Sequence, residues 1–278
     1  MKKIAIVVHG GAGPDSDYIK EHIKEYEEGL REAVNAGYDI LEQGGTAVDA
    51  VEAAVNYLED NPLFNAGKGS ALNEDAKVEM CASIMDGKER NCGAAAIVKG
   101  VRNPVTLARG IMEKTKHVYL GDTGACDFAE QMGLHLEPES YFVTEYQYES
   151  YQKAKEEQHG EPTGSSKEKI HKHGTVGAVA LDHEGNLAAA TSTGGLEFCK
   201  RGRIADSSMI GVGTFADNDT CAVSTTGDGE YHMRFVSAFH IAALVEYKGL
   251  SIQEAARFLI HEKCNCVDAD MGLIAVDK

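Results

Sequence analysis

The sequence lacks three features that would place it in a common class of protein. It has no apolar stretch of membrane-spanning length, and the apolar run that follows Met1-Lys-Lys is too short for the core of a signal peptide. It also lacks an excess of basic residues, because 44 acidic residues against 27 basic ones give a net charge of −17. Nucleic acids and anionic membranes bind basic patches, so neither is an expected partner.

The seven cysteines lack the spacing of a metal site or a disulfide framework. Their number is odd, no pair forms a CxxC, and Cys264 and Cys266 form only a CxC. Buried thiols in a reducing compartment explain this pattern best. The sequence therefore predicts a cytoplasmic protein without a required cofactor.

Hydrophobic periodicity predicts a single domain of mixed α and β structure over residues 1–278. Ile4–Val8 is a short continuous apolar run, which is typical of a strand buried on both faces. Helical spacing follows over 18–43, and Thr46 can cap a second helix over 47–58. Further strands are expected at 78–85, 93–98, 176–181, 187–191, 221–225 and 272–276, and further helices near Pro104, near Thr123, over 230–247 and over 252–264.

Residues 138–174 differ in composition from the rest of the chain. They are rich in Glu, Lys, Tyr, Gln and Ser and contain almost no aliphatic residues. Such a segment buries too little apolar surface to offset the entropy lost on ordering. A flexible linker is therefore predicted over 138–174, and it separates two more regular halves of the chain.

The linker ends at Gly174-Thr175. A threonine hydroxyl is a weak nucleophile that needs a base, and one solution is the threonine's own free α-amine. That amine has a reference pKa of ~7.7–8.0, so an appreciable fraction accepts a proton at neutral pH. Thr175 acquires such an amine only if the Gly174–Thr175 bond is cut. Taken alone the signal is weak, because most threonines in this position simply begin a strand.

Several short motifs strengthen the case for Thr175. They are His9-Gly-Gly-Ala-Gly13, Phe64-Asn65-Ala66-Gly67, Thr191-Ser-Thr-Gly-Gly195, Gly202-Arg-Ile-Ala-Asp-Ser207 and Ser224-Thr-Thr-Gly-Asp-Gly-Glu230. Together they resemble the plant-type L-asparaginase / isoaspartyl peptidase family over nearly the whole chain.

The resemblance implies a fold and a reaction. The expected fold is α+β, a four-layer αββα sandwich of the N-terminal-nucleophile hydrolase type. Autocleavage would give an α subunit (1–174) and a β subunit (175–278), and two cleaved αβ units would form a homodimer. The expected reaction is hydrolysis of L-asparagine or β-aspartyl peptides to L-aspartate, so the partner is a small-molecule or dipeptide substrate.

The resemblance also implies roles for individual residues. Thr175 corresponds to the nucleophile, Thr193 to a residue that hydrogen-bonds it, and Asn65 to a residue near it. Thr226 and the Gly227 N–H correspond to the oxyanion hole, whose donors stabilise a tetrahedral oxygen.

Substrate recognition and a metal site follow from the same comparison. Arg203 and Asp206 correspond to the pair that holds the substrate's α-carboxylate and α-ammonium, which suits a guanidinium fork and a carboxylate. Gly229 corresponds to a backbone contact with the substrate amine, together with Thr226 and Gly227. A structural sodium ion is implied, held largely by the backbone carbonyls of Leu58, Glu59, Asn61, Phe64, Ala66 and Lys68.

The chain departs from the family pattern at several positions. Cys81 replaces an aspartate, Phe198-Cys199 replaces an Asn-Lys pair, and Ala205 replaces a glycine. These changes are expected to alter a polar network or the rim of the pocket. Relatives normally continue with another strand beyond the end at Lys278, and without it a sheet edge would be exposed.

Other interpretations remain open at the level of sequence. A glycosylasparaginase would use the same aspartyl half of its substrate, and Thr226-Gly-Asp-Gly229 resembles that sister family too. The strand and turn at Val7–Gly11 also resemble the phosphate-binding start of amino-acid kinases. A self-cleaving relative that only binds aspartate-like ligands is a third alternative. Arg203 and Asp206 alone would suit a surface ion pair.

Overall fold

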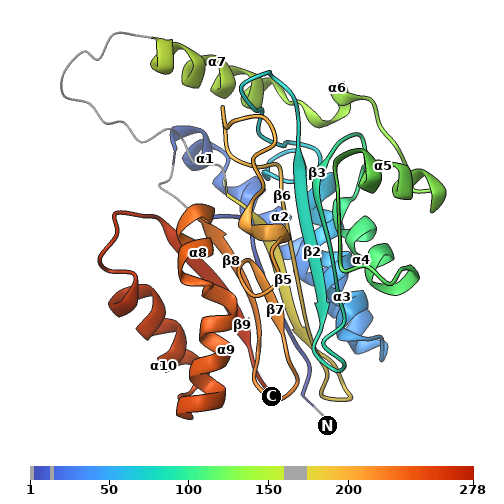
Figure 1. Ribbon diagram of the computed structural model, residues 1–278, viewed down its shortest axis with the longest axis vertical. Coiled ribbons are helices and arrows are strands. Elements are labelled where there is room, and N and C mark those ends of the chain that lie inside the picture. Colours follow the sequence, from blue (N-terminus) through green and yellow to red (C-terminus); the bar gives the residue numbers. More distant parts are fainter. Residues whose placement is uncertain (1–2, 13–15, 160–173) are drawn as a thin grey trace.

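The computed structural model describes residues 3–12, 16–159 and 174–278. Strands in these ranges form two sheets (Figure 1). The larger sheet has the order β1-β5-β6-β2-β3-β4, and the smaller has the order β7-β8-β9. The strands are β1 (Ala5–His9), β2 (Met80–Asp86), β3 (Cys92–Val98), β4 (Tyr119–Gly121), β5 (Val176–Leu181), β6 (Leu187–Thr193), β7 (Thr214–Ala216), β8 (Ala222–Gly227) and β9 (Met271–Val276).

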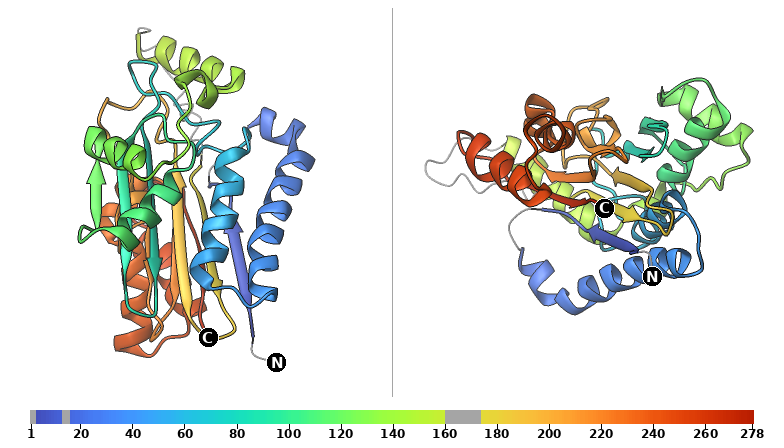
Figure 2. Two further views of the ribbon diagram at one scale, coloured as in Figure 1. Left: turned by 90° about the vertical axis from the view of Figure 1, so that its right-hand side faces the viewer. Right: turned by 90° about the horizontal axis from the view of Figure 1, so that it is seen from below.

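The helices cover the sheets from two sides (Figure 2). Helices α2 and α3 pack on the larger sheet, as does α4, whereas α9 packs on β8 of the smaller one. The helices are α1 (Asp17–Glu21), α2 (Ile23–Glu42), α3 (Ala47–Asp60), α4 (Pro104–Lys114), α5 (Asp122–Gln131), α6 (Glu139–Phe142), α7 (Glu145–His159), α8 (Gly229–Phe235), α9 (Ser237–Lys248) and α10 (Ile252–Arg257), with a 3₁₀ turn η1 (Asp206–Ser208) and a π-helical turn η2 (Phe258–Lys263).

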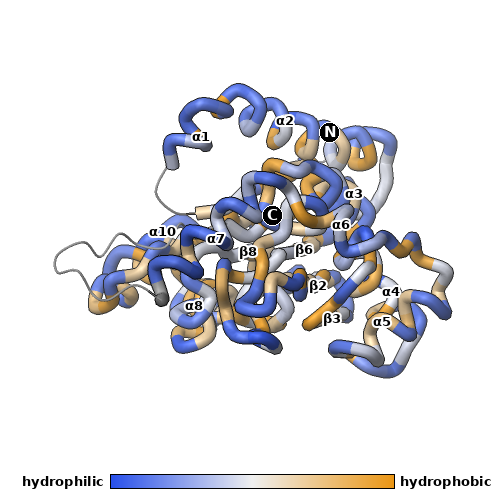
Figure 3. Tube along the Cα trace, turned by 90° about the horizontal axis from the view of Figure 1, so that it is seen from above, coloured by the Kyte–Doolittle hydropathy of each residue, from blue (hydrophilic) through white to orange (hydrophobic). Residues whose placement is uncertain are grey.

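Strands β5 and β6 form the centre of the molecule because both of their faces are buried. Ala178 and Ala190 point toward α3, and the small side chains let the helix approach closely. Val179 and Leu187, on the opposite face, pack against the smaller sheet. The alternation follows from the two-residue period of a strand. Hydrophobic residues are accordingly concentrated in the strands and the inner faces of the helices (Figure 3).

Strand β1 differs from its prediction. It pairs with β5 and lies at the edge of the larger sheet, and Val7 is 39% exposed. The expectation of a strand buried on both faces is therefore wrong, because a short apolar run does not reveal whether a strand is central. The last residue of β1, His9, is nevertheless buried.

The expectation of a flexible linker is wrong for residues 139–159, where the structure has helices α6 and α7. Phe142, Tyr151 and Ala154 are buried, and Gln147 Nε2 donates a hydrogen bond to the Gly69 carbonyl at 2.7 Å. The segment contains few aliphatic residues, but the rings of Phe142 and Tyr151 supply the apolar surface that it buries. The remainder of the predicted linker, 160–173, lies outside the described residues.

Two of the predicted helices are interrupted. The helix expected over 230–247 breaks at Val236, whose φ of 49° is left-handed, so α8 and α9 are separate. The helix expected over 252–264 widens into the π-helical turn η2 after Arg257. Among the helices of the described ranges, none combines the length and apolar character needed to cross a membrane.

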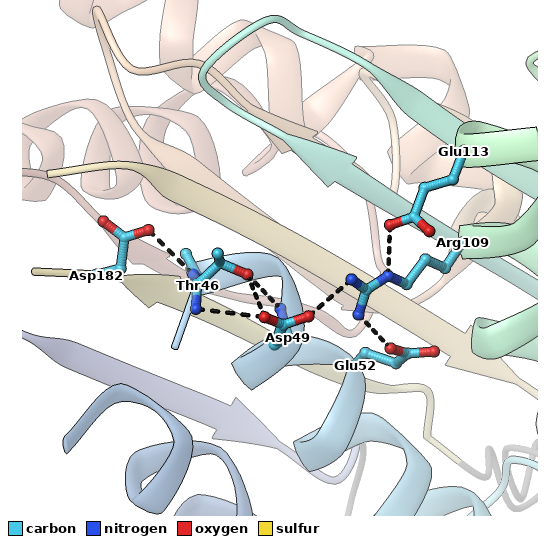
Figure 4. Close-up of polar contacts among 7 residues, drawn as sticks. Thr46, Asp49, Glu52, Arg109, Glu113 and Asp182 are labelled. Atoms are coloured by element: carbon cyan, nitrogen blue, oxygen red, sulfur yellow. Dashed lines mark hydrogen bonds and ion pairs between the residues drawn. The ribbon is translucent and has the colours of Figure 1, made fainter. Parts of the chain in front are cut away.

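Thr46 and Arg109 connect α3 to its neighbours (Figure 4). The Thr46 hydroxyl accepts a hydrogen bond from the Asp49 N–H at 3.1 Å and so caps α3. Arg109 of α4 then pairs with Asp49 at 2.7 Å, Glu52 at 2.6 Å and Glu113 at 2.7 Å. One guanidinium thus joins two helices and forms ion pairs with three carboxylates.

We expect Arg109→Gln to lower the free energy of unfolding by about 2 kcal/mol, because a half-buried network loses its only cation and three carboxylates then repel one another. Urea unfolding monitored by circular dichroism measures this change. Lys20→Gln is the control, since the Lys20–Asp17 pair at 3.2 Å is exposed and should contribute under about 1 kcal/mol. Equal effects of the two substitutions would contradict the network.

Candidate active site

Thr175 lies where the two sheets meet. It directly precedes β5 of the larger sheet, and its N–H donates to Thr226 Oγ1 at 3.2 Å. The Thr226 hydroxyl in turn donates to the Thr175 carbonyl at 3.3 Å. Thr226 belongs to β8 of the smaller sheet, so a single side chain holds both backbone groups of Thr175 across the gap.

Most of the residues predicted for catalysis and substrate binding line one small cavity. Its walls are Thr175, Thr193, Gly195, Leu196, Arg203, Asp206, Gly227, Asp228, Gly229 and Glu230. These residues come from the ends of β6 and β8, the start of α8 and the loop between β6 and η1. The cavity volume of about 10 Å³ has room for roughly one water molecule.

Arg203 and Asp206 do not form the surface ion pair that spacing alone allowed. Asp206 is 3% exposed, and Thr225 Oγ1 donates to its Oδ2 at 3.1 Å. Burial raises the pKa of Asp206, although the positive charge of Arg203 opposes that rise. A buried carboxylate beside a guanidinium is suited to pairing with an ammonium group.

Glu230 holds the guanidinium of Arg203 by two parallel hydrogen bonds. Arg203 Nε and Nη2 each lie 3.0 Å from a Glu230 carboxylate oxygen. Burial disfavours the guanidinium charge, but the hydrogen bonds and the charge of Glu230 raise the pKa of Arg203. Glu230 ends one of the sequence motifs, but the sequence assigned it no role. Its contact with Arg203 joins residues 27 apart in the chain, and no local sequence pattern reveals such a contact.

Two glycines leave space that the site requires. Gly227 has a φ of 110°, and a Cβ there would lie 2.1 Å from the Asp270 carbonyl oxygen. A Cβ on Gly229 would lie 2.5 Å from Asp206 Oδ1 and 3.0 Å from Arg203 Nη2. Any side chain at 229 would therefore push these charged groups out of place.

Thr193 and Asn65 shape the turn at Gly194–Gly195. Thr193 Oγ1 accepts from the Gly195 N–H at 3.2 Å, and Asn65 Nδ2 donates to the Gly195 carbonyl at 2.8 Å. The Asn65 side chain also accepts from the Ala71 N–H at 2.8 Å. Thr193 lines the cavity beside Thr175, whereas Asn65 is outside its lining and supports the turn from behind.

The glycine turn after β1 packs against the bond that is predicted to be cut. A Cβ on Gly174 would lie 2.0 Å from Gly11 Cα, and one on Gly10 would lie 2.4 Å from the ring of Phe64. This packing leaves no cradle for a phosphate, which argues against the kinase interpretation. His9 Nδ1 lies 2.8 Å from the Thr175 carbonyl oxygen, a contact that the motif by itself did not reveal.

Three of the residues that depart from the family pattern, Cys81, Phe198 and Ala205, have apolar surroundings. Cys81 and Ala205 pack against each other with Ala96, and burial raises the pKa of the Cys81 thiol, which therefore stays neutral. Phe198 has a φ of 52°, and its ring lies 5.6 Å from that of Tyr151 in α7. The unusual residues thus make an apolar backing for the loop that carries Arg203.

The loop that is predicted to hold a sodium ion closes on itself. The Lys68 N–H donates to the Glu59 carbonyl at 2.7 Å, and the Phe64 N–H donates to the Asn61 carbonyl at 3.2 Å. Gly69 has a φ of 103°, and a Cβ there would lie within 2.7 Å of the carbonyl oxygens of Pro62 and Phe64. Backbone oxygens are therefore crowded on one turn. Among the described residues, no cluster of three metal-binding side chains occurs.

Comparison with known proteins agrees with this geometry. The asparaginase family model matches residues 2–278. The chain is similar to the isoaspartyl peptidase/L-asparaginase of Homo sapiens, with 45% identity over 282 residues that cover 100% of this chain and 88% of the relative. It is also similar to the isoaspartyl peptidase of Escherichia coli strain K12, with 42% identity over 282 residues and the same coverage. The chain therefore belongs to the asparaginase family.

Proposed function

We propose that the protein is an amidohydrolase that cuts its own Gly174–Thr175 bond and then hydrolyses L-asparagine or β-aspartyl peptides to release L-aspartate. The observation that carries this proposal is the shared cavity: Thr175 opens onto the same space as Arg203 and Asp206. The names of the Homo sapiens and Escherichia coli relatives, isoaspartyl peptidase/L-asparaginase and isoaspartyl peptidase, support the same reaction class.

The fold proposed for this function is the four-layer αββα sandwich of N-terminal-nucleophile hydrolases. Its support is the packing of α3 on β5, of β5 on β8, and of β8 on α9. Residues 1–278 would be one domain that becomes an α subunit (1–174) and a β subunit (175–278). This order of layers places the ends of β5, β6 and β8 beside one another, where the cavity lies.

Self-cleavage would begin with attack of the Thr175 hydroxyl oxygen on the Gly174 carbonyl carbon. The C–N bond breaks as a C–O ester forms, and the hydroxyl proton passes to the departing nitrogen. Water then hydrolyses the ester, which gives a Gly174 carboxylate and a Thr175 with a free α-amine. Packing of Gly11 against Gly174 holds the scissile peptide beside the nucleophile.

Substrate hydrolysis would use the same oxygen with the new amine as its base. The amine takes the hydroxyl proton, and Thr175 Oγ1 attacks the side-chain amide carbon of the aspartyl group. The Gly227 N–H and the Thr226 hydroxyl, once it has turned away from the Thr175 carbonyl, would stabilise the tetrahedral oxyanion. Ammonia or a peptide amine leaves with a proton, and water releases L-aspartate from the ester.

Arg203 and Asp206 would hold the common aspartyl half of the substrates. Glu230 occupies the Nε/Nη2 edge of the guanidinium, which leaves the Nη1/Nη2 edge for the α-carboxylate. Asp206, next to Gly229, would pair with the α-ammonium. A glycosylated asparagine presents the same half, so this recognition does not favour it over the simpler substrates.

A structural sodium ion fits the loop formed by Leu58, Glu59, Asn61, Phe64, Ala66 and Lys68. Hard cations take oxygen ligands, and the loop crowds carbonyl oxygens around one turn. The ion would stabilise the loop that carries Asn65 and would take no part in the chemistry, for which we propose no cofactor.

The proposal includes an oligomeric state and a cellular location. Two cleaved αβ units would form a homodimer, and the exposed apolar side chains of Tyr119, Ile204 and Phe239 are candidates for its interface. All seven cysteines are free thiols, which supports a cytoplasmic location. The net charge of −17 favours neither nucleic acid nor an anionic membrane as a partner.

We expect the purified protein to consist of two fragments, one ending at Gly174 and one beginning with Thr175. Thr175→Ala should stay whole and inactive because it lacks the attacking oxygen, whereas Thr175→Ser should cleave and turn over more slowly. Intact mass, N-terminal sequencing and release of aspartate measure these outcomes. Turnover by an uncut wild-type protein, or by Thr175→Ala, would exclude the mechanism.

We expect Arg203→Lys to raise KM while self-cleavage proceeds, because lysine keeps the charge but loses the planar fork. Glu230→Gln should raise KM by a smaller factor, roughly tenfold or less, since it weakens the grip on Arg203 without removing the guanidinium. Steady-state kinetics with a β-aspartyl dipeptide measure both effects. Unchanged KM in Arg203→Lys would refute the recognition role.

We expect the midpoint of thermal unfolding to be higher in sodium chloride than in choline chloride at the same ionic strength, because only sodium fits a ring of carbonyl oxygens. The control is Gly69→Ala, whose methyl group would collide with the carbonyls of Pro62 and Phe64 and should abolish the difference. Identical midpoints of the wild-type protein in both salts would argue against the ion.

A further inference from the structure

A row of buried hydroxyl groups crosses the space between the two sheets and ends at Thr175. Thr214 Oγ1 donates to Thr191 Oγ1 at 2.6 Å, and Thr191 Oγ1 lies 2.7 Å from Ser224 Oγ. Ser224 Oγ lies 2.9 Å from His9 Nε2, and His9 Nδ1 lies 2.8 Å from the Thr175 carbonyl oxygen. All five residues are buried.

The direction of these hydrogen bonds follows from the carbonyl at their end. A carbonyl oxygen only accepts, so His9 Nδ1 must carry a proton. Burial lowers the pKa of His9 to about 4, so the ring is neutral near pH 7 and Nε2 must accept from the Ser224 hydroxyl. Ser224 then has no proton left for Thr191, so the Thr191 hydroxyl must donate across the 2.7 Å contact, although the Gly213 carbonyl at 3.1 Å is a second acceptor for the same proton. Every proton in the row points toward Thr175.

Gly177 leaves the space that this row occupies. A Cβ on Gly177 would lie 2.0 Å from Ser224 Oγ and 2.5 Å from His9 Nε2. Gly177 is the register partner of His9 in β1 and of Thr191 in β6, so it lies at the point where the row passes between the sheets. A side chain at 177 would separate the ring from the hydroxyl.

We propose that His9 is a positioning residue that clamps the Thr175 carbonyl, and that Ser224 and the hydroxyls behind it fix the ring proton that the clamp requires. This inference rests on the proposed role of Thr175 as the nucleophile. After the Gly174–Thr175 bond is cut, Thr175 is a chain end that precedes its strand and is held only by its contacts with neighbouring side chains. The clamp would keep its carbonyl, and so its side chain, aimed at the cavity.

Thr191 offers a matched pair of substitutions, because it lies in the row but does not contact Thr175. Thr191→Val keeps the shape of the side chain and removes the hydroxyl, whereas Thr191→Ser keeps the hydroxyl and removes a methyl group. We expect Thr191→Val to lower kcat, and the rate of self-cleavage, roughly ten- to a hundredfold, since small misplacements of a nucleophile have effects of this size. KM should change less than roughly twofold, and Thr191→Ser should retain most of the activity.

A purely packing role would give the opposite order, with Thr191→Ser impaired and Thr191→Val near the wild type, and would overturn the proposal. A second measurement does not depend on turnover. Nitrogen-15 NMR of the histidine rings should show His9, identified by its loss in His9→Gln, with the proton on Nδ1 at pH 7.5. Thr191→Val should shift that signal. A proton on Nε2 in the wild-type protein would refute the clamp.

Different results would contradict the role of Thr175 as nucleophile and the role of His9 as a clamp. An active Thr175→Ala protein would exclude the nucleophile, whatever the state of the His9 ring. A cleaved and active wild-type protein whose Thr191→Val variant keeps full kcat and an unchanged His9 signal would exclude the clamp alone.

Discussion

The hydrogen bonds between Thr226 and the backbone of Thr175 are the contact on which the site depends. Thr175 directly precedes β5 of the larger sheet, and Thr226 lies near the end of β8, the central strand of the smaller one. The two sheets must pack in one register for these residues to meet. Stability of the core and placement of Thr175 are therefore set by the same packing of β5 and β6 on β8.

The buried hydroxyl groups between the two sheets are compatible with the packing of the sheets, because they form hydrogen bonds with one another. Thr191, Thr214 and Ser224 satisfy one another between the sheets, so their burial carries little of the usual penalty. The row they form also supplies a direction, because a carbonyl at one end determines every proton behind it. A buried network of this kind can specify one arrangement of a site more sharply than apolar packing does.

The cavity is small, and its most exposed wall is Glu230. Its carboxylate balances the charge of Arg203, which would otherwise lie buried and unpaired. A substrate would bring both a carboxylate and an ammonium, so the net charge of the site would stay the same while Glu230 keeps its edge of the Arg203 guanidinium. The apolar backing from Cys81 and Ala205 lets the Arg203 loop pack closely beside η1.

The sequence by itself determined the elements whose signals are local. The strands β5 and β6 and the cap at Thr46 depend on neighbouring residues, and the structure has them. The motifs also named the family and the residues around Thr175. Only the tertiary structure decided what depends on distant partners. It placed β1 at an edge, ordered 139–159 through aromatic contacts, paired Arg203 with Glu230 and brought His9 to the Thr175 carbonyl. Such contacts join segments far apart in the chain, and no local pattern encodes them.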